Sequence, residues 1–224
     1  MKQEYEKNLG VTSILLKHYF QYWKDEYFGK VRKLWVDVEG KFRVNPPELN
    51  GVPIVGRRDA IYDHDGQLVL LEHKTKSSWD DTNIAFLLLR DLQCMVYIKT
   101  FEIETGQRID KIQYNLIKRP AIRLKQDESL TAFGKRLDET ISENPQSYFA
   151  KIEMPVNWKT VNAQWELVMQ DCKKYIEWYT KHDKDSEYTE NCVTHFGECE
   201  FLQLCSGLTD IRIQKRDAPH IELK

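Results

Sequence analysis

The sequence has no apolar run of the roughly 20 residues that a membrane-spanning helix needs, and its first residues, MKQEYEKNLG, lack the apolar core of a secretion signal. These absences exclude an integral membrane protein and a secreted one, so we expect a soluble, cytoplasmic protein. An excess of positive charge is also missing, because the net charge is -2 at pH 7. A uniformly basic surface is therefore excluded, and a nucleic-acid partner would have to be held by local basic patches.

Linkers, repeats and low-complexity segments are absent too, and apart from the adjacent Pro46 and Pro47 the glycines and prolines fall singly where turns are expected. The 224 residues are enough for one substantial core, so we predict a single domain over residues 1–224. Charged residues make up 30% of the chain, so each short basic run is either a nucleic-acid contact or a solvated face. The runs are GRR (56–58), KTK (74–76), IKRPAIRLK (117–125) and KVRK (30–33).

Apolar periodicity predicts the elements of this domain. Helices are expected where apolar residues recur at helical spacing, over residues 11–31, 83–101, 128–143 and 158–181. Strands are expected where apolar and polar residues alternate, over residues 34–44 with a bend at Gly40, 52–62, 67–75 and 110–117. The order indicates an α/β (α+β) sandwich, with a small central mixed sheet flanked by helices and a helical C-terminal part.

The segment VGRRDAIYDHDGQLVLLEHKTK places three charged side chains on two apolar strands. DHDG between the strands supplies the chemistry of a tight turn. If the last two residues of DHDG form a two-residue loop, the antiparallel ladder brings Asp59 opposite Glu72. Lys74 follows Glu72 by two residues and therefore points to the same face of its strand.

Two carboxylates opposite each other repel, so something must offset their charge. A divalent cation does so, because Mg²⁺ is typically held by one or two carboxylates together with waters or phosphate oxygens. Lys74 beside such an ion can orient or deprotonate a water and stabilise charge on a phosphate, an arrangement that suits hydrolysis of a phosphodiester. The alternative is a salt-bridged trio on a solvent-facing strand end, because Asp, Glu and Lys are common residues.

The same hairpin resembles that of the PD-(D/E)xK nucleases, in particular the RecB-like branch with its GxxDxx...(D/E)xKT pattern. In that family the first Asp and the second acid bind the metal and the Lys is catalytic, which corresponds here to Asp59, Glu72 and Lys74. The resemblance covers about residues 10–118 and implies the restriction-endonuclease-like core, with residues of about 120–210 as C-terminal helices and a cysteine cluster.

The RecB-like branch also has a QxxxY motif on a downstream helix. Gln93 and Tyr97 match it in DLQCMVY, and at i and i+4 they share a helix face. The resemblance implies that both side chains lie at the edge of the active site, where they contact the DNA backbone or hold the lysine. The alternative is a core tyrosine with a packing or capping glutamine.

Other positions correspond less closely. RecB-like nucleases, including the CRISPR-associated exonucleases, often carry a metal-binding His on the helix before the sheet, and His18 stands at about that place. A packing or surface histidine is the alternative. Glu39 resembles an acidic position on the first strand of the family. Arg57 and Lys76 are candidate phosphate contacts, and Trp79 is a candidate for stacking on a base.

Five cysteines, an odd number, argue against a disulfide framework. Cys192, Cys199 and Cys205 form the pattern C-x6-C-x5-C, which suggests Zn²⁺ or an iron–sulfur cluster. Some RecB-like exonucleases hold a [4Fe–4S] cluster with such a trio and one N-terminal cysteine, but here no cysteine precedes Cys94. His195 is an alternative fourth ligand, and three packed or free thiols are the other interpretation.

The sequence and the resemblance together predict a Mg²⁺- or Mn²⁺-dependent deoxyribonuclease, and they favour an exonuclease of bacterial or phage DNA processing and recombination. The expected partner is DNA, single-stranded or as duplex ends, in the cytoplasm of a bacterial or phage-infected cell. A homo-oligomer and a recombination or repair partner remain open. The rival interpretations are an endonuclease with the same catalytic residues, and a nucleic-acid-binding or assembly module that keeps the fold without catalysis.

Overall fold

The computed structural model describes residues 2–25, 33–77, 88, 90–180, 193–194 and 197–198. The chain divides into two compact units, Met1–Val44 with Ile54–Trp165 and Asn45–Pro53 with Glu166–Lys224. The second unit holds the short 3-10 helix η1 (Pro47–Leu49), most of helix α6 (Trp158–Thr180) and the two-residue strands β8 (Val193–Thr194) and β9 (Gly197–Glu198). No helix within the described residues is long and apolar enough to cross a membrane.

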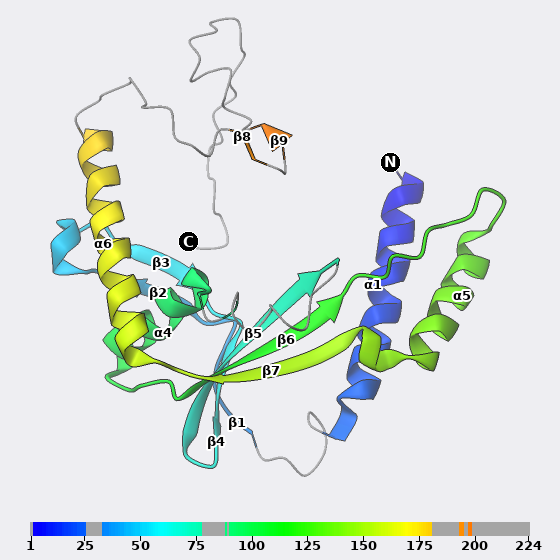
Figure 1. Ribbon diagram of the computed structural model, residues 1–224, viewed down its shortest axis with the longest axis horizontal. Coiled ribbons are helices and arrows are strands. Elements are labelled where there is room, and N and C mark those ends of the chain that lie inside the picture. Colours follow the sequence, from blue (N-terminus) through cyan, green and yellow to red (C-terminus); the bar gives the residue numbers. More distant parts are fainter. Residues whose placement is uncertain are drawn as a thin grey trace, which may run out of the picture. The chain divides into compact units, whose positions relative to one another are not determined.

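The first unit is an α/β structure built on a five-stranded mixed sheet with the strand order β1-β4-β5-β6-β7 (Figure 1). Strands β5 and β6 are parallel, and every other neighbouring pair is antiparallel. Strands β2 (Lys41–Val44) and β3 (Ile54–Arg57) form a separate antiparallel hairpin. The five strands of the main sheet are β1 (Leu34–Val38), β4 (Ala60–His64), β5 (Gln67–Lys76), β6 (Lys111–Lys118) and β7 (Phe149–Pro155).

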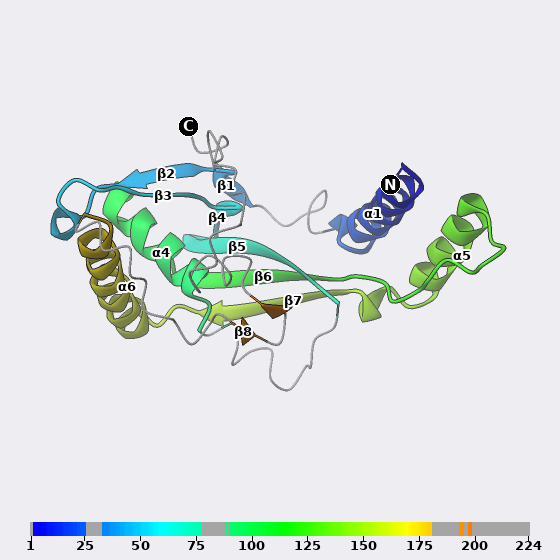
Figure 2. The ribbon, with the colours of Figure 1, turned by 90° about the horizontal axis from the view of Figure 1, so that it is seen from above.

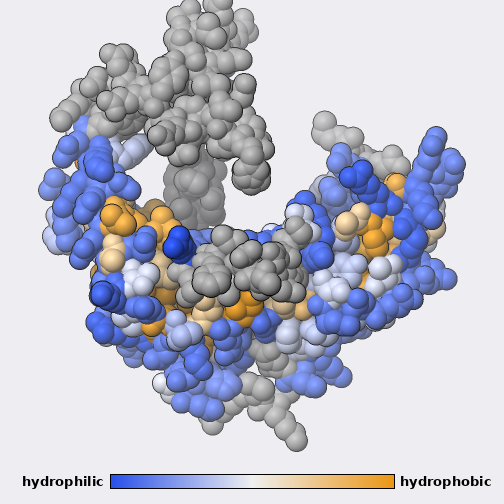
Figure 3. All heavy atoms as spheres, viewed as in Figure 1, coloured by the Kyte–Doolittle hydropathy of each residue, from blue (hydrophilic) through white to orange (hydrophobic). Residues whose placement is uncertain are grey.

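Helices cover both faces of the main sheet. Helix α4 (Leu92–Thr105) packs on one face, where Leu70 of β5 and Ile112 of β6 join its apolar residues in one core cluster. Helices α1 (Lys2–Tyr22) and α5 (Leu130–Glu143) pack together and against Phe149 in a second cluster on the opposite face. The two helices lie side by side in both views (Figures 1 and 2), and apolar side chains gather between them (Figure 3).

Capping explains where the central helix begins and ends. The side chain of Asp91 accepts hydrogen bonds from the backbone N–H groups of Gln93 and Cys94, which otherwise lack partners at a helix start. Gly106 ends the helix in the left-handed conformation, with φ 71°, which a side chain rarely adopts. The single helix predicted over 83–101 is interrupted, because the backbone of Asp91 is extended, and α4 begins directly after it.

Three further predictions about strands are corrected by the structure. The strand predicted over 34–44 is divided at Glu39, whose φ of 50° turns the chain, so β1 and β2 belong to different sheets. Strand β7, at the edge of the main sheet, was not predicted, although Ile152 and Met154 alternate there with Lys151 and Glu153. The strand predicted over 52–62 is divided as well, because β3 pairs with β2 whereas β4 belongs to the main sheet. Strands β5 and β6 and helices α5 and α6 agree with the prediction to within two residues at each end. Helix α1 begins earlier than expected, and its expected end at residue 31 lies outside the described residues.

Candidate active site

The turn between β4 and β5 sets the register of the hairpin. Asp65 and Gly66 have φ values of 53° and 83°, which a two-residue hairpin turn requires. The predicted pairing of His64 with Gln67 is confirmed, and the ladder continues to Ala60 opposite Leu71.

The ladder ends at that pair. Asp59 lies at a bend outside β4, so the predicted backbone pairing with Glu72 is not formed, and the side chain of Asp59 bonds to β5 instead. Its Oδ2 accepts a hydrogen bond from the backbone N–H of His73 at 2.8 Å, and none of the described residues donates to its other oxygen. Alternation along the strands puts Asp59 and Glu72 on the α4 side of the sheet, together with Ile61 and Leu70. The carboxylate of Asp59 is close enough to raise the pKa of Glu72, so the structure brings the two acids together.

A sharp bend in the chain positions Asp59. The backbone O of Asp59 accepts from Glu39 N–H at 2.8 Å, and Arg58 N–H donates to the backbone O of Gly40 at 3.0 Å. These two bonds join the point where β1 turns into β2 to the point where β3 turns into β4. Asp59 therefore stands at a bend that the backbone holds from both sides.

Lys74 is held by three acceptors. Its Nζ lies 2.9 Å from Oε1 of Glu72 and 3.1 Å from Oδ2 of Asp91, and it donates to Oε1 of Gln93 at 2.7 Å. Gln93 Nε2 in turn donates to the hydroxyl of Tyr97 at 2.8 Å. An ammonium has three donors, so every proton of Lys74 has an acceptor and the side chain is fixed in place.

The carboxylate of Glu72 is buried and only half satisfied. Its side chain is 3% exposed, and its Oε2 has no hydrogen-bond partner among the described residues. Burial raises the pKa of Glu72 to about 6, opposed by the hydrogen bond from Lys74 and increased by the charge of Asp59. A buried carboxylate oxygen without a donor is costly, so this oxygen is suited to receive a cation.

Lys74 keeps its charge in this arrangement. Burial by itself lowers the pKa of Lys74, but the hydrogen bonds and charges of Glu72 and Asp91 outweigh it, so the pKa lies above its ordinary value. An ammonium that stays protonated at neutral pH can orient a group and stabilise negative charge. It does not accept a proton.

Two residues of the site were missed by sequence reasoning. Asp91 is both the N-cap of α4 and a partner of Lys74, and its place before LQCMVY was the available signal. Arg58 is 2% exposed and forms ion pairs with Asp37 and Glu104. Its Nε also donates to the backbone O of Tyr97 at 3.4 Å, so the residue next to Asp59 holds the helix that carries the QxxxY motif.

The structure places the other predicted residues apart from this cluster. His18 lies on α1, which packs on the opposite face of the sheet, and its Nε2 is 2.9 Å from Oδ1 of Asp138. Arg57 is exposed at the end of β3 and pairs with Glu39 at 3.1 Å. Lys76 follows Lys74 on the same face of β5 and ends that strand.

Trp79 and the proposed cysteine ligands, Cys192, Cys199 and Cys205, lie outside the described residues, as does His195.

Two acids are available for a metal ion. No group of three or more His, Cys, Asp or Glu side chains that could hold a metal occurs within the described part of the chain. A site with two carboxylates still fits Mg²⁺, which usually keeps several waters and takes only one or two carboxylates from the protein. The unpartnered Oε2 of Glu72 next to Asp59 has the chemistry that such an ion needs.

Comparison with known proteins does not extend this description, since the sequence matches no protein-family model and no curated protein. The candidate site consists of Asp59 and Glu72 on the hairpin, Lys74 beside them, and Asp91, Gln93 and Tyr97 at the start of α4.

Proposed function

We propose that this protein is a metal-dependent nuclease that hydrolyses phosphodiester bonds in DNA at the site around Glu72. The observation that carries the proposal is the buried, unpartnered Oε2 of Glu72, between the charge of Asp59 and an ammonium that stays protonated. A structural salt bridge alone does not explain this oxygen, because a carboxylate buried for stability is normally hydrogen-bonded on both oxygens.

Asp59 and Glu72 would hold a Mg²⁺ or Mn²⁺ ion. When bound, the ion supplies Lewis-acid polarisation of the scissile phosphate and lowers the pKa of a water. Asp59 is prepared for this role, because the N–H of His73 orients one of its oxygens and leaves the other available. Glu72 binds in its ionised form, which predominates above its pKa of about 6.

Lys74 would orient the attacking water and stabilise the negative charge that develops on the phosphate. Gln93 fixes the ammonium by accepting one of its protons, and Tyr97 fixes the amide of Gln93. The helix start therefore positions Lys74, which agrees with the role that the QxxxY resemblance implies for the two residues. An incoming phosphate oxygen would replace one of the three acceptors around Nζ.

The first test is degradation of end-labelled linear DNA and closed-circular DNA with Mg²⁺, Mn²⁺ or EDTA. We expect metal-dependent loss of DNA, and Lys74→Ala should slow it by about 10²- to 10³-fold, the usual cost of removing one group that stabilises the transition state. The matched control is Lys111→Ala, which removes a lysine at the start of the neighbouring strand β6 and should retain activity.

Comparing linear with closed-circular DNA distinguishes an exonuclease from an endonuclease. Loss of linear DNA alone identifies the exonuclease that the resemblance favours, and cutting of the circle identifies an endonuclease. DNA binding without cleavage in any metal contradicts the proposal and supports the binding module.

A further inference from the structure

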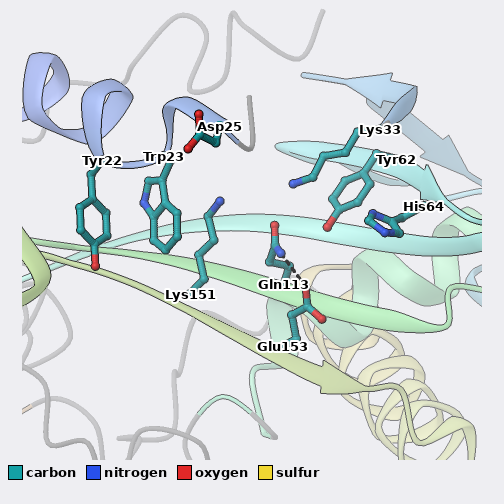
Figure 4. Close-up of a pocket in the computed structure, with 9 residues that line it drawn as sticks. All are labelled: Tyr22, Trp23, Asp25, Lys33, Tyr62, His64, Gln113, Lys151 and Glu153. Carbon is teal, nitrogen blue, oxygen red and sulfur yellow. Dashed lines mark hydrogen bonds between the residues drawn. The ribbon is translucent and has the colours of Figure 1, made fainter. Parts of the chain in front are cut away.

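A cavity lies on the face of the sheet opposite Glu72 and Lys74. Its volume is about 660 Å³, within the range of ligand sites. Figure 4 shows side chains from the end of α1, from β4, and from β6 and β7 surrounding it. It opens on the face of β6 that carries Gln113, whereas Ile112 and Tyr114 point into the core under α4.

Gln113 is the unexplained group in this cavity. Its side chain is buried, with the residue 4% exposed, and its Nε2 donates to Oε1 of Glu153 at 2.8 Å. A carboxylate only accepts, so this contact fixes the amide with its oxygen directed away from Glu153, toward the cavity (Figure 4). That oxygen has no partner among the described residues. It requires a donor, which a ligand can supply.

Aromatic rings and ammonium groups line the cavity around this amide. Lys151 Nζ lies 4.0 Å from the ring centre of Trp23, and Lys33 Nζ lies 4.4 Å from that of Tyr62. The indole N–H of Trp23 is buried and has no acceptor within the described part of the chain. Two carboxylates, Asp25 and Glu153, also line it, and Glu153 is bonded to Gln113. The cavity thus offers flat apolar surfaces, one donor and one acceptor without partners among the described residues, and charges of both signs.

We propose that this cavity binds a nucleotide, either free or as one unit of a single strand. A base is flat, stacks on aromatic rings, and carries N–H donors and ring acceptors on its edge, which match Gln113 Oε1 and Trp23 Nε1. A phosphate carries the negative charge that Lys33 and Lys151 attract.

The cavity and the proposed catalytic site lie on different faces of the sheet, so the inference does not rest on the proposed function. A nucleotide bound here, free or within a strand, would lie on the other face of the sheet from Asp59 and Glu72, the proposed metal ligands. Such binding would persist even if the hairpin proved inactive.

The test is calorimetric titration of the full chain in EDTA with deoxyadenosine monophosphate, deoxyribose 5-phosphate and a phosphorothioate-linked pentadeoxyadenylate. We expect the mononucleotide to bind at least about tenfold more tightly than the sugar phosphate, since it gains stacking and the amide hydrogen bond. Gln113→Met should remove most of that difference, and Lys151→Gln should weaken binding of all three probes. Lys135→Gln, on an exposed lysine of α5, is the control and should change nothing.

The relative affinities of the three probes identify the ligand. Tighter binding of the pentanucleotide than of the mononucleotide assigns the cavity to a strand, and equal binding of the two assigns it to a free nucleotide. Lys74→Ala should leave either result unchanged, which separates this cavity from the hairpin site. Equal affinity for the nucleotide and the sugar phosphate, affinity unchanged in the folded Gln113→Met and Lys151→Gln variants, or no binding at millimolar concentration would overturn the proposal.

Discussion

Glu72 has two properties that are unusual for a carboxylate buried only to stabilise a fold. A residue that only stabilised the fold would be buried with all of its polar atoms paired, yet Oε2 of Glu72 has no partner within the described part of the chain and its pKa is raised to about 6. The raised pKa means that folding favours the protonated form over the ionised one. Above pH 6 the ionised Glu72 therefore lowers the stability of the protein, unless a cation is bound.

The sign of this effect gives a test of Glu72 by substitution. The folded-state pKa of about 6 exceeds the ordinary 4.5, so the free energy of unfolding falls as the pH rises through this window. Glu72→Gln mimics the protonated acid, and in EDTA at pH 8 it should raise the free energy of unfolding by about 2 kcal/mol. This gain in stability should vanish well below pH 4.5, where Glu72 is protonated in both the folded and the unfolded wild-type protein.

Urea denaturation at pH 8 and pH 4 measures this difference. Glu139→Gln, on an exposed residue of α5, is the control and should change stability by less than about 0.5 kcal/mol. If Glu72→Gln destabilised the protein at pH 8, Glu72 and Lys74 would be a stabilising ion pair, and the salt-bridged alternative would hold.

Metal binding should follow the same two acids. Mn²⁺ should raise the melting temperature of the wild type, because a ligand that binds only the folded state stabilises it, and Asp59→Asn or Glu72→Gln should abolish the shift. Affinity should fall as the pH drops below about 6, since a proton on Glu72 competes with the ion. Thermal melts at pH 5.5 and pH 7.5 measure both effects.

The control for this experiment is His18→Ala. Because His18 is paired with Asp138 on the opposite face of the sheet, its loss should leave the Mn²⁺ shift unchanged. If His18→Ala abolished the Mn²⁺-induced rise in melting temperature, His18 would have to be a metal ligand.

The elements of the site are joined by one buried arginine. Arg58 lies at the bend between β3 and β4, and its guanidinium pairs with Asp37 of β1 and Glu104 of α4. It also lies 4.7 Å from the ring centre of Phe42. A Cβ at Gly40 would collide with the carboxylate of Asp37 and would have to displace it from Arg58. The position of Asp59 relative to α4 therefore depends on a charged cluster that the hairpin motif does not include.

Two neighbouring arginines provide a matched comparison. Arg58→Met should lower the free energy of unfolding by about 3 kcal/mol, because it leaves two partly buried carboxylates without their partner. Arg57→Met removes only an exposed ion pair with Glu39 and should cost less than about 1 kcal/mol. Denaturant unfolding of the two variants measures the difference, and equal costs would contradict the role assigned to Arg58.

The molecule as a whole carries too little positive charge to attract DNA over its whole surface. With a net charge of -2, affinity must come from a few local contacts, and the exposed Arg57 and the Lys76 that follows the site are the described candidates. Each phosphate contact contributes about 0.9 to the slope of log K against log salt concentration. A protein that uses few contacts should show a shallow slope.

Salt titration of DNA binding in EDTA tests this point. Lys76→Ala and Arg57→Ala should each reduce the slope by about 1 and weaken binding to all sequences alike. Lys135→Ala, far along α5 from the hairpin, should leave the slope unchanged. Unchanged slopes in the first two variants would show that other groups contact the phosphates.

Sequence reasoning succeeded where the determining contacts are local. The two-residue turn at Asp65 and Gly66 sets the register of the hairpin, and strand alternation then puts Glu72 and Lys74 on one face. Gln93 and Tyr97 are bonded to each other as their spacing of four residues allows. These features depend on residues within one turn or one hairpin, so the sequence by itself determined them.

Only the tertiary structure decided which distant residues complete the site. Arg58 meets Glu104 across 46 positions of the chain, and Lys74 meets Asp91 across the start of a helix that periodicity alone extended too far. His18 lies on the wrong face for the hairpin acids because the apolar face of α1 packs against α5. Such contacts depend on how layers pack in space, and a local pattern of residues carries no information about the partner that packing supplies.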